Sequence, residues 1–287
     1  MRFLTADVFT DRAYGGNQLG VFPDAEGLDT RQMQAIAREL NLAETTFVTP
    51  GSAASRFAVR IFTPLAELPF AGHPTVGTAV VLAHLGRVGE AGDIVLEEGV
   101  GSVRVTLRPG GATFFMQGAA ETRPTPIAPV ALADALGLKR TQLAGDPWQA
   151  GYGNVPYMLV PLKDRAAVAQ SSLNAERWHA LTQDSWADRA VYAYAATGHD
   201  GDTSFIHARM FAPRLGIAED PATGSAAAAL AGSLDTDATC LRIDQGVEMG
   251  RPSRIDARMT RVAGAVTGIS IGGAAVVVSE GRLLRLP

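Results

Sequence analysis

Two short stretches of this sequence place titratable side chains beside proline and glycine. The first is His73-Pro74-Thr75-Val76-Gly77, and the second is Asp220-Pro221-Ala222-Thr223-Gly224. An imidazole and a carboxylate can both accept and return protons, as general acid–base catalysis requires. His73 and Asp220 are therefore candidate proton carriers. The alternative is that both residues only cap helices, because polar residues followed by proline are common at helix starts.

Glu44 is a third candidate proton carrier. It opens a predicted strand over residues 45–48, which would lead into the core. The equivalent strand of the second half, residues 190–194, contains no carboxylate. The two halves of the repeat therefore differ at this position. In a duplicated fold, a catalytic group that acts on one side of a substrate is expected at a position where the two halves differ. The alternative is an ordinary glutamate at the edge of a strand.

Motifs for metal or cofactor chemistry are absent from the sequence. Its five histidines have no metal-ligand spacing, and its glycines fit neither a phosphate-binding loop nor a dinucleotide fingerprint. Lys139 and Lys163 are the only lysines, which leaves few candidates for a Schiff base. We therefore expect neither a metal nor an organic cofactor.

The two stretches belong to an internal repeat. With a constant offset of 147 residues, residues 73–79 align with 220–226, and residues 94–100 align with 241–247. Residues 60–64 also match 209–213, with two extra residues in the first copy's connection. The repeat predicts two similar halves, each built around one copy.

Each copy predicts the start of a buried helix. His73 or Asp220 is expected at the N-cap, with proline in the first turn and an apolar run after it. The unpaired N–H groups and the positive dipole end of a helix start favour an anion. Two related helix starts therefore predict two halves that hold one small carboxylate-bearing ligand, the alternative being two ordinary helices in a duplicated fold.

The hydrophobic pattern predicts an α+β protein in which each half is a mostly antiparallel sheet wrapped round one apolar helix. The proline-rich segment 119–130 is expected to link the halves. The predicted domains are thus residues 1–118 and 119–287, with the last strand a candidate to pack back on the first domain. Further helices are expected at 29–40, 131–137 and 174–183, and strands at 1–9, 19–22, 56–62, 93–97, 100–108, 112–117, 156–160, 190–195 and 204–211.

A Gly-Asn pair precedes the second strand of each half, as Gly16-Asn17 and Gly153-Asn154. Asparagine tolerates left-handed backbone conformations, so both pairs are expected to form turns. Ligand contact by Asn17 and Asn154 is the second interpretation.

Composition excludes several classes of partner. The net charge of the 287 residues is −4 and no basic run occurs, so we expect no binding to nucleic acid or to an anionic membrane. Cys240 is the only cysteine, which excludes a disulfide framework. Nothing at the N-terminus resembles a signal peptide, and no apolar run reaches about 18 residues. A cytoplasmic location is expected.

Several motifs together identify a family. They are Gly16-Asn17, Leu42-Ala43-Glu44-Thr45, Phe70-Ala71-Gly72-His73-Pro74-Thr75, Glu219-Asp220-Pro221-Ala222-Thr223-Gly224-Ser225-Ala226, and Gln245-Gly246 with Met249-Gly250-Arg251-Pro252-Ser253. In these motifs the sequence resembles the phenazine-biosynthesis PhzF-like isomerase family. The resemblance implies a diaminopimelate-epimerase-like fold, an active site in a cleft between two domains, a homodimer, and cofactor-independent isomerisation by proton transfer.

The resemblance also implies roles for particular residues. Glu44 matches the family's catalytic acid/base, and His73 and Asp220 match its assisting polar residues. Ser225 is implied to lie near the substrate, which the backbone N–H groups of Gly72-His73 and Gly224-Ser225 would hold.

The function expected from all of this is an isomerase that moves a proton within a small carboxylate-bearing substrate, for example a cyclic, dihydro-hydroxyanthranilate-like one. One alternative is an amino-acid-type epimerase, with His73 and Asp220 as bases on opposite faces of the substrate. Neither helix start carries a cysteine, which argues against two-thiol epimerase chemistry. The other alternative is a protein that binds an anionic metabolite without turning it over.

Overall fold

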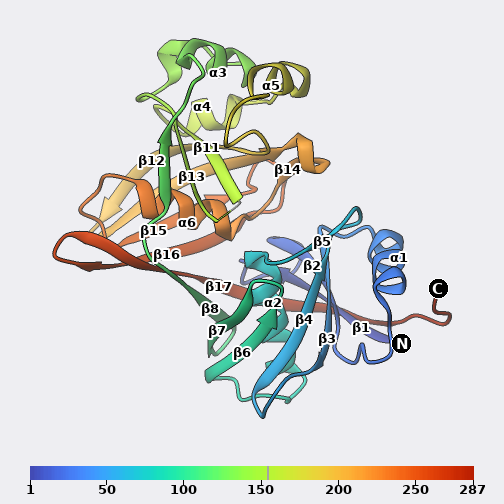
Figure 1. The fold of residues 1–287 in the computed structure, drawn as a ribbon. Coiled ribbons are helices and arrows are strands. Elements are labelled where there is room, and N and C mark those ends of the chain that lie inside the picture. The colour runs from blue at the N-terminus through green and yellow to red at the C-terminus, as the bar shows by residue number, and fades with distance from the viewer. Residues whose placement is uncertain (154) are drawn as a thin grey trace. The chain divides into compact units, whose positions relative to one another are not determined.

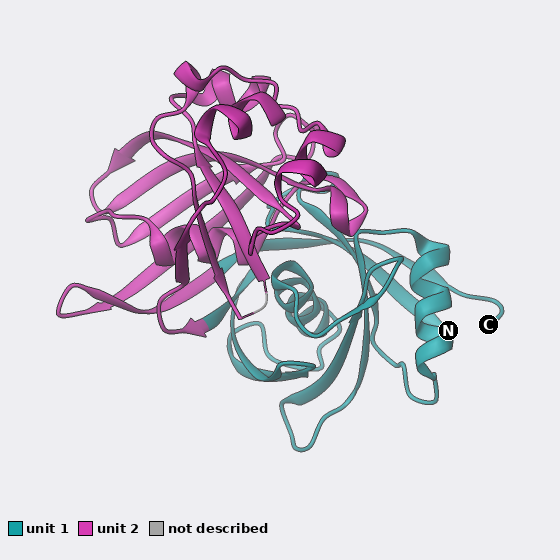
Figure 2. Ribbon diagram, turned by 45° about the horizontal axis from the view of Figure 1, so that its top comes forward, with its two compact units in different colours: residues 1–115, 272–287 teal, residues 116–271 magenta. Residues whose placement is uncertain are grey.

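The chain forms two compact units in a computed structural model that describes residues 1–153 and 155–287 (Figure 1). Unit 1 consists of Met1–Phe115 with Gly272–Pro287, and unit 2 of Met116–Ile271, as coloured in Figure 2. The long strand β17 (Ala265–Arg282) begins in unit 2 and ends in unit 1. Asn154, a predicted ligand contact, lies outside the described residues.

The strands of unit 1 pair in a closed ring. Strand β1 pairs with β17 and β2, and the ring continues through β3, β4, β6 and β7 to β8, which pairs with β17 again. The β2–β3 and β4–β6 pairs are parallel, whereas the β1–β17, β1–β2, β3–β4, β6–β7 and β7–β8 pairs are antiparallel. The strand bounds are β1 Arg2–Val8, β2 Asn17–Phe22, β3 Glu44–Pro50, β4 Arg56–Phe62, β5 Glu67–Leu68, β6 Gly92–Glu98, β7 Gly101–Arg108 and β8 Gly111–Gln117.

Helix α2 (Gly72–His84) is the central helix of unit 1 and contacts β1, β2, β3 and β7. Its residues are buried from Gly72 to Ala79 and again at Val81 and Leu82, so the helix has no polar face. A Cβ atom at Gly77 would lie 2.5 Å from Leu19 Cδ2 and 2.6 Å from Val8 Cγ2. Glycine at this position therefore lets the helix approach β1 and β2 closely.

Helix α1 (Thr30–Leu40) packs on the aromatic side chains of β2, β3 and β4. The Asp29 carboxylate accepts a hydrogen bond from the Gln32 N–H group, and the Gln32 side chain accepts one from the Asp29 N–H group, which forms a capping box. The apolar side of the helix is Met33, Ile36 and Ala37, and the aromatic residues below it are Phe22, Phe47 and Phe62.

Unit 2 repeats this order of strands. The β11–β12 and β13–β15 pairs are parallel, as are β2–β3 and β4–β6 in unit 1, and the β9–β10, β10–β11, β12–β13 and β15–β16 pairs are antiparallel. The predicted α+β class is confirmed. The strand bounds are β9 Glu121–Pro124, β10 Trp148–Tyr152, β11 Val155–Pro161, β12 Val191–Asp200, β13 Thr203–Ala212, β14 Ile217–Asp220, β15 Cys240–Gln245 and β16 Ser253–Val262.

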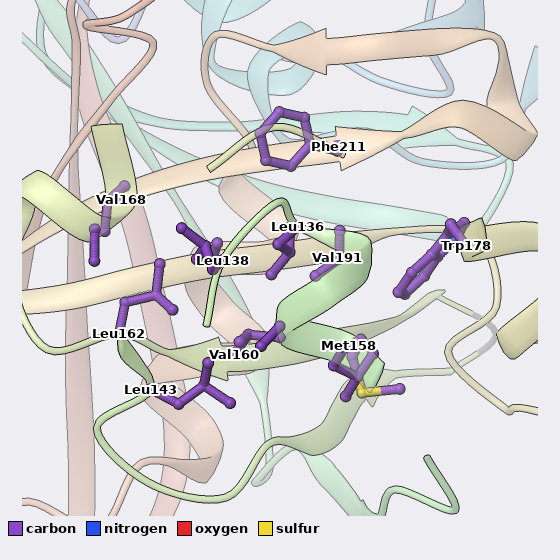
Figure 3. Close-up of a cluster of buried hydrophobic side chains, with 14 of the residues drawn as sticks. Leu136, Leu138, Leu143, Met158, Val160, Leu162, Val168, Trp178, Val191 and Phe211 are labelled. Carbon is purple, nitrogen blue, oxygen red and sulfur yellow. The ribbon is translucent and has the colours of Figure 1, made fainter. Parts of the chain in front are cut away.

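Helix α6 (Gly224–Ser233) is the counterpart of α2 and contacts β10, β11, β15 and β16. Three shorter helices, α3 (Pro129–Ala135), α4 (Arg165–Gln170) and α5 (Ala175–Leu181), lie together in Figure 1. With β11, β12 and β13 they enclose the apolar cluster of Figure 3, whose largest member is Trp178. Among the described residues, no helix is both long and apolar enough to span a membrane.

The proline-rich segment 119–130, predicted as the linker between the halves, contains regular structure. Residues Glu121–Pro124 form β9, which pairs antiparallel with β10, and Pro129 begins α3. Pro124 is the last residue of β9, where a missing N–H group removes little from the ladder. Strands β9, β10 and β14 and helix α4 lacked a signal in the sequence, because short segments of this kind form through their partners rather than through local propensity.

Candidate active site

Three of the predicted site residues lie together in unit 1. Asn17 is the first residue of β2, Glu44 is the first residue of β3, and His73 lies in the first turn of α2. Strands β2 and β3 run parallel, with Leu19 opposite Glu44, so both strands begin at the same end of the sheet. The Nε2 atom of His73 lies 3.1 Å from Oε2 of Glu44, and its Nδ1 atom lies 3.2 Å from Nδ2 of Asn17.

Burial controls the protonation of His73. The residue is 5% exposed and Glu44 is 8% exposed. Removal from water disfavours the charged imidazolium and lowers the pKa of His73 to about 3, although a backbone hydrogen bond with Gln18 opposes the shift. His73 is therefore neutral at neutral pH and cannot serve as a fixed positive charge.

A neutral imidazole carries a single N–H proton, which limits how His73 and Glu44 can face each other. If the proton is on Nε2, it points at an ionised Glu44. If it is on Nδ1, then Nε2 presents a lone pair and Glu44 must carry the proton itself. In both arrangements one proton lies between His73 Nε2 and Glu44 Oε2, because without it the lone pairs of the two atoms would face each other. The pair is thus suited to take up or release a proton.

The predicted N-cap role of His73 is wrong. Helix α2 begins at Gly72 with Ala71 at the N-cap, so His73 lies inside the first turn and Pro74 directly follows it. Proline is tolerated here because the first N–H groups of a helix have no partner within the helix. The His73 side chain is consequently free of the backbone of its own helix and reaches β2 and β3 instead.

The predicted N-cap role of Asp220 is also wrong. Asp220 is the last residue of β14, where it pairs with Met210 of β13, and helix α6 begins only at Gly224 with Thr223 at the N-cap. A residue before proline favours extended backbone, which fits the strand end at Asp220. The buried Asp220 carboxylate still serves the helix start, because it accepts a hydrogen bond from the Thr223 hydroxyl.

Gln245, at the end of β15, holds the same segment. Its Nε2 atom donates to the carbonyl of Asp220 at 2.8 Å and to Thr223 Oγ1 at 2.9 Å. Its Oε1 atom accepts from the Thr223 N–H group at 3.3 Å and from the Tyr192 hydroxyl at 3.1 Å. Burial, with the nearby Tyr157 and Asp220, raises the pKa of Tyr192, so this tyrosine remains a neutral donor.

Ser225 and Gly224 form the first turn of α6 in unit 2. Gly224 is buried, and Ser225 is partly exposed with its Oγ atom 2.7 Å from the Tyr157 hydroxyl. Gly72 is the corresponding buried first residue of α2 in unit 1. The candidate residues therefore form two groups, one in each unit: Asn17, Glu44, Gly72 and His73 in unit 1, and Asp220, Gly224 and Ser225 in unit 2.

Sequence reasoning did not single out Tyr157 or Thr223 as part of the second group. Tyr157 lies on β11, far from α6 in the sequence, and reads as an ordinary strand tyrosine. Thr223 could have been found, since threonine is a favoured N-cap residue and stands directly before Gly224.

Comparison with known proteins decides the family. A family model described as phenazine biosynthesis-like protein matches residues 6–281. The chain belongs to the phenazine biosynthesis-like family. The family resemblance expected from the sequence motifs is thereby confirmed.

Full-length relatives of this PhzF family member include named enzymes. The chain is 42% identical to an uncharacterized isomerase of Mesorhizobium japonicum, with 98% of each chain covered. It is 36% identical to trans-2,3-dihydro-3-hydroxyanthranilate isomerase of Pseudomonas aeruginosa, again with 98% of each chain covered. The crystal structure of a PhzF-family phenazine biosynthesis protein of Bacillus anthracis matches with a TM-score of 0.87 and 26% identity, covering 99% of each chain. The chain is thus a PhzF-like enzyme, and several of its full-length relatives are named isomerases.

Proposed function

We propose that this protein is a cofactor-independent isomerase that moves a proton within a small, cyclic, carboxylate-bearing substrate of the dihydro-hydroxyanthranilate type. The observation that carries the proposal is the buried 3.1 Å contact of His73 Nε2 with Glu44 Oε2 at the start of β3, an arrangement suited to the transfer of one proton. The relative from Pseudomonas aeruginosa, named for the isomerisation of trans-2,3-dihydro-3-hydroxyanthranilate, supports the substrate class.

In the proposed mechanism Glu44 is the proton carrier. Glu44 takes a proton from one carbon of the substrate and returns it to another carbon on the same face. The neutral His73 fixes the Glu44 carboxyl group through its Nε2 atom, and Asn17 holds the other side of the imidazole ring. Because the same carboxyl group removes and returns the proton, no second base is needed.

The two helix starts would bind the substrate carboxylate. The first N–H groups of α2, at Gly72 and His73, and those of α6, at Gly224 and Ser225, are unpaired within their helices. We propose that both groups of residues face one substrate molecule, with Asp220 and Ser225 completing the site from unit 2. Each helix start contributes about 0.3–1 kcal/mol to anion binding when exposed and up to about 2 kcal/mol when partly buried, which orients the ligand.

The protonation of His73 argues against the epimerase alternative. Two bases on opposite faces of a substrate must both be able to hold a proton at working pH. A histidine whose pKa is about 3, already in contact with Glu44, is poorly suited to this at neutral pH. The binding-protein alternative differs from both enzymes in that it moves no proton.

Solvent-isotope incorporation tests the proposal. The wild-type protein is incubated with trans-2,3-dihydro-3-hydroxyanthranilate in heavy water, and substrate and product are analysed by proton NMR and mass spectrometry. We expect isomerised product. The carbon that receives the proton should carry deuterium in proportion to how far the Glu44 proton exchanges with solvent between turnovers. Without any isomerisation or label, the protein is not this isomerase.

Replacement of Glu44 tests the role of the carboxyl group. Glu44→Gln retains volume but cannot carry a proton, so we expect turnover to fall by about 10²–10⁴-fold or more with little change in melting temperature. The matched control is Glu39→Gln, the same substitution at an exposed position of α1. A Glu44→Gln protein with near wild-type turnover would transfer the catalytic role to His73 or Asp220.

The homodimer and the cytoplasmic location remain predictions from the family resemblance and the sequence. Size-exclusion chromatography with light scattering measures the first, and fractionation of the source cells measures the second.

A further inference from the structure

Glu98 is a buried carboxyl group that the mechanism above does not use. It is the last residue of β6 and is 7% exposed. Its Oε1 atom lies 2.8 Å from Thr75 Oγ1, and its Oε2 atom is buried without a hydrogen-bond partner among the described residues. Thr75 belongs to the first turn of α2, as His73 does.

The Thr75 hydroxyl lies within reach of two acceptors, and the one to which it donates depends on the protonation of Glu98. The Thr75 hydroxyl lies 2.8 Å from the carbonyl oxygen of Ala71 and 2.8 Å from Glu98 Oε1. A hydroxyl has one proton, and a carbonyl oxygen can only accept. When Thr75 donates to Ala71, Glu98 must therefore be the donor to Thr75, which requires a neutral carboxylic acid. Burial favours this neutral acid and raises the pKa of Glu98 to about 8, whereas a Thr75 hydroxyl that donated to Glu98 instead of Ala71 would lower the pKa.

The backbone beyond Glu98 is pressed against the segment that leads into α2. A Cβ atom at Gly99 would lie 2.7 Å from Cα of Pro69, and the Val100 N–H group donates to the Pro69 carbonyl at 3.0 Å. The end of β6 thus touches the entry to α2 at Pro69 and again at Thr75. Both contacts restrain the turn that carries His73.

The repeat contains a related contact in unit 2 with an amide in place of the acid, although its partner Thr223 aligns with Val76 rather than with Thr75. Glu98 and Gly99 align with Gln245 and Gly246 at the offset of 147 residues. Gln245 donates to Thr223 at the start of α6, and a Cβ atom at Gly246 would lie 2.6 Å from the Pro221 carbonyl oxygen. An amide is always neutral and always a donor. Its position in the second unit indicates that the helix start needs a neutral donor from the neighbouring strand end.

Apart from the Thr75 hydroxyl, the surroundings of Glu98 offer its charged form no partner among the described residues. On α2 the titratable residues are His73, which burial keeps neutral, and His84 at the opposite end of the helix. On β7 the residue opposite Glu98 is Gly101, and the segment from Pro69 to Ala71 has no titratable side chain. Glu97 points to the other face of β6, where it pairs with Arg56.

We propose that Glu98 is a positioning residue: as a neutral acid it donates to Thr75 and fixes the first turn of α2, and its ionisation in alkaline solution releases this turn and lowers turnover. The structural part of the proposal concerns α2 alone. Its consequence for turnover rests on the proposed function, in which His73 of the same turn holds Glu44.

The pH profile of turnover tests the catalytic consequence. In the wild type we expect kcat to fall in alkaline solution. In Glu98→Gln we expect this fall to be absent or to occur at least one pH unit higher. At pH 6 the two proteins should have similar kcat. The control is Glu97→Gln, the neighbouring and solvent-accessible glutamate, which should keep the wild-type profile. An alkaline fall of kcat at the same pH in wild type and Glu98→Gln overturns the proposal.

Hydrogen exchange in the substrate-free protein tests the structural part and needs no turnover, so it separates this proposal from the proposed function. We expect the amides of residues 75–78 to be at least tenfold more protected in Glu98→Gln than in the wild type at pH 9, and equally protected at pH 6. Equal protection of the wild type and Glu98→Gln at both pH values overturns the proposal. A Glu98→Gln protein that loses protection at pH 6 or does not fold also overturns it, because glutamine supplies the same neutral donor.

Discussion

Replacing Glu98 by glutamine should stabilise the folded protein, by an amount that grows with pH. Burial raises the pKa of Glu98 from the ordinary value of 4.5 to about 8 in the folded chain. Between these values the folded chain holds a proton that the unfolded chain has released, so the wild type loses stability as pH rises. The loss is about 1.4 kcal/mol for each pH unit, or about 3 kcal/mol at pH 7. Glutamine has no proton to lose and avoids this cost.

Thermal melting of the two proteins between pH 5 and pH 9 measures the effect. The difference in free energy of unfolding should be small near pH 5, should rise through pH 7, and should level off above about pH 8. At pH 7 the melting temperature of Glu98→Gln should be roughly 6–12 °C higher than that of the wild type, at about 2–4 °C per kcal/mol for a chain of this size class. A difference that does not change with pH would show that Glu98 has the same protonation state in the folded and unfolded chains, which would refute the reasoning.

The site and the core allow further predictions. Asp220→Ala should destabilise the protein by about 1–3 kcal/mol, because the Thr223 hydroxyl loses its acceptor, whereas Asp220→Asn should recover most of the loss in a melting experiment. Gly77→Ala should lower the melting temperature, because overpacking against β1 and β2 costs about 1–3 kcal/mol and outweighs the gain of about 1 kcal/mol in helix propensity. The control is Gly145→Ala, where the nearest atom is 3.8 Å from the added Cβ, and its melting temperature should be nearly unchanged. Purified protein should carry no stoichiometric metal in elemental analysis, and turnover should be unchanged by EDTA; loss of activity that added metal restores would contradict this.

The sequence was most informative where the repeat and the motifs agreed. The repeat predicted two related halves around two apolar helices, and α2 and α6 are those helices. The contact of Glu44 with His73 joins two residues that the sequence had proposed as proton carriers for separate reasons.

The start of each central helix could not be predicted, because long-range contacts decide it. His73 and Asp220 occupy equivalent positions and both precede proline, yet one lies inside a helix and the other ends a strand. Asp220 stays extended because β14 pairs with β13, a partner that the local sequence does not reveal. Glu98 illustrates the same limit: Ile94, Leu96 and Glu98 alternate on the buried face of β6, but the Thr75 hydroxyl that receives it is far away in the sequence.

The course of β17 has a consequence for how the protein is made. Residues 275–282 of this strand pair with β1 in the ring of unit 1, and they are synthesised after every residue of unit 2. While unit 2 leaves the ribosome, β1 therefore lacks one of its two partner strands, and an unpaired strand edge invites association with other chains. Unit 2, a continuous segment, has no such delay. A fragment ending at Phe115 should therefore be prone to aggregate, and one in which residues 272–287 are joined to it by a flexible linker should be more soluble.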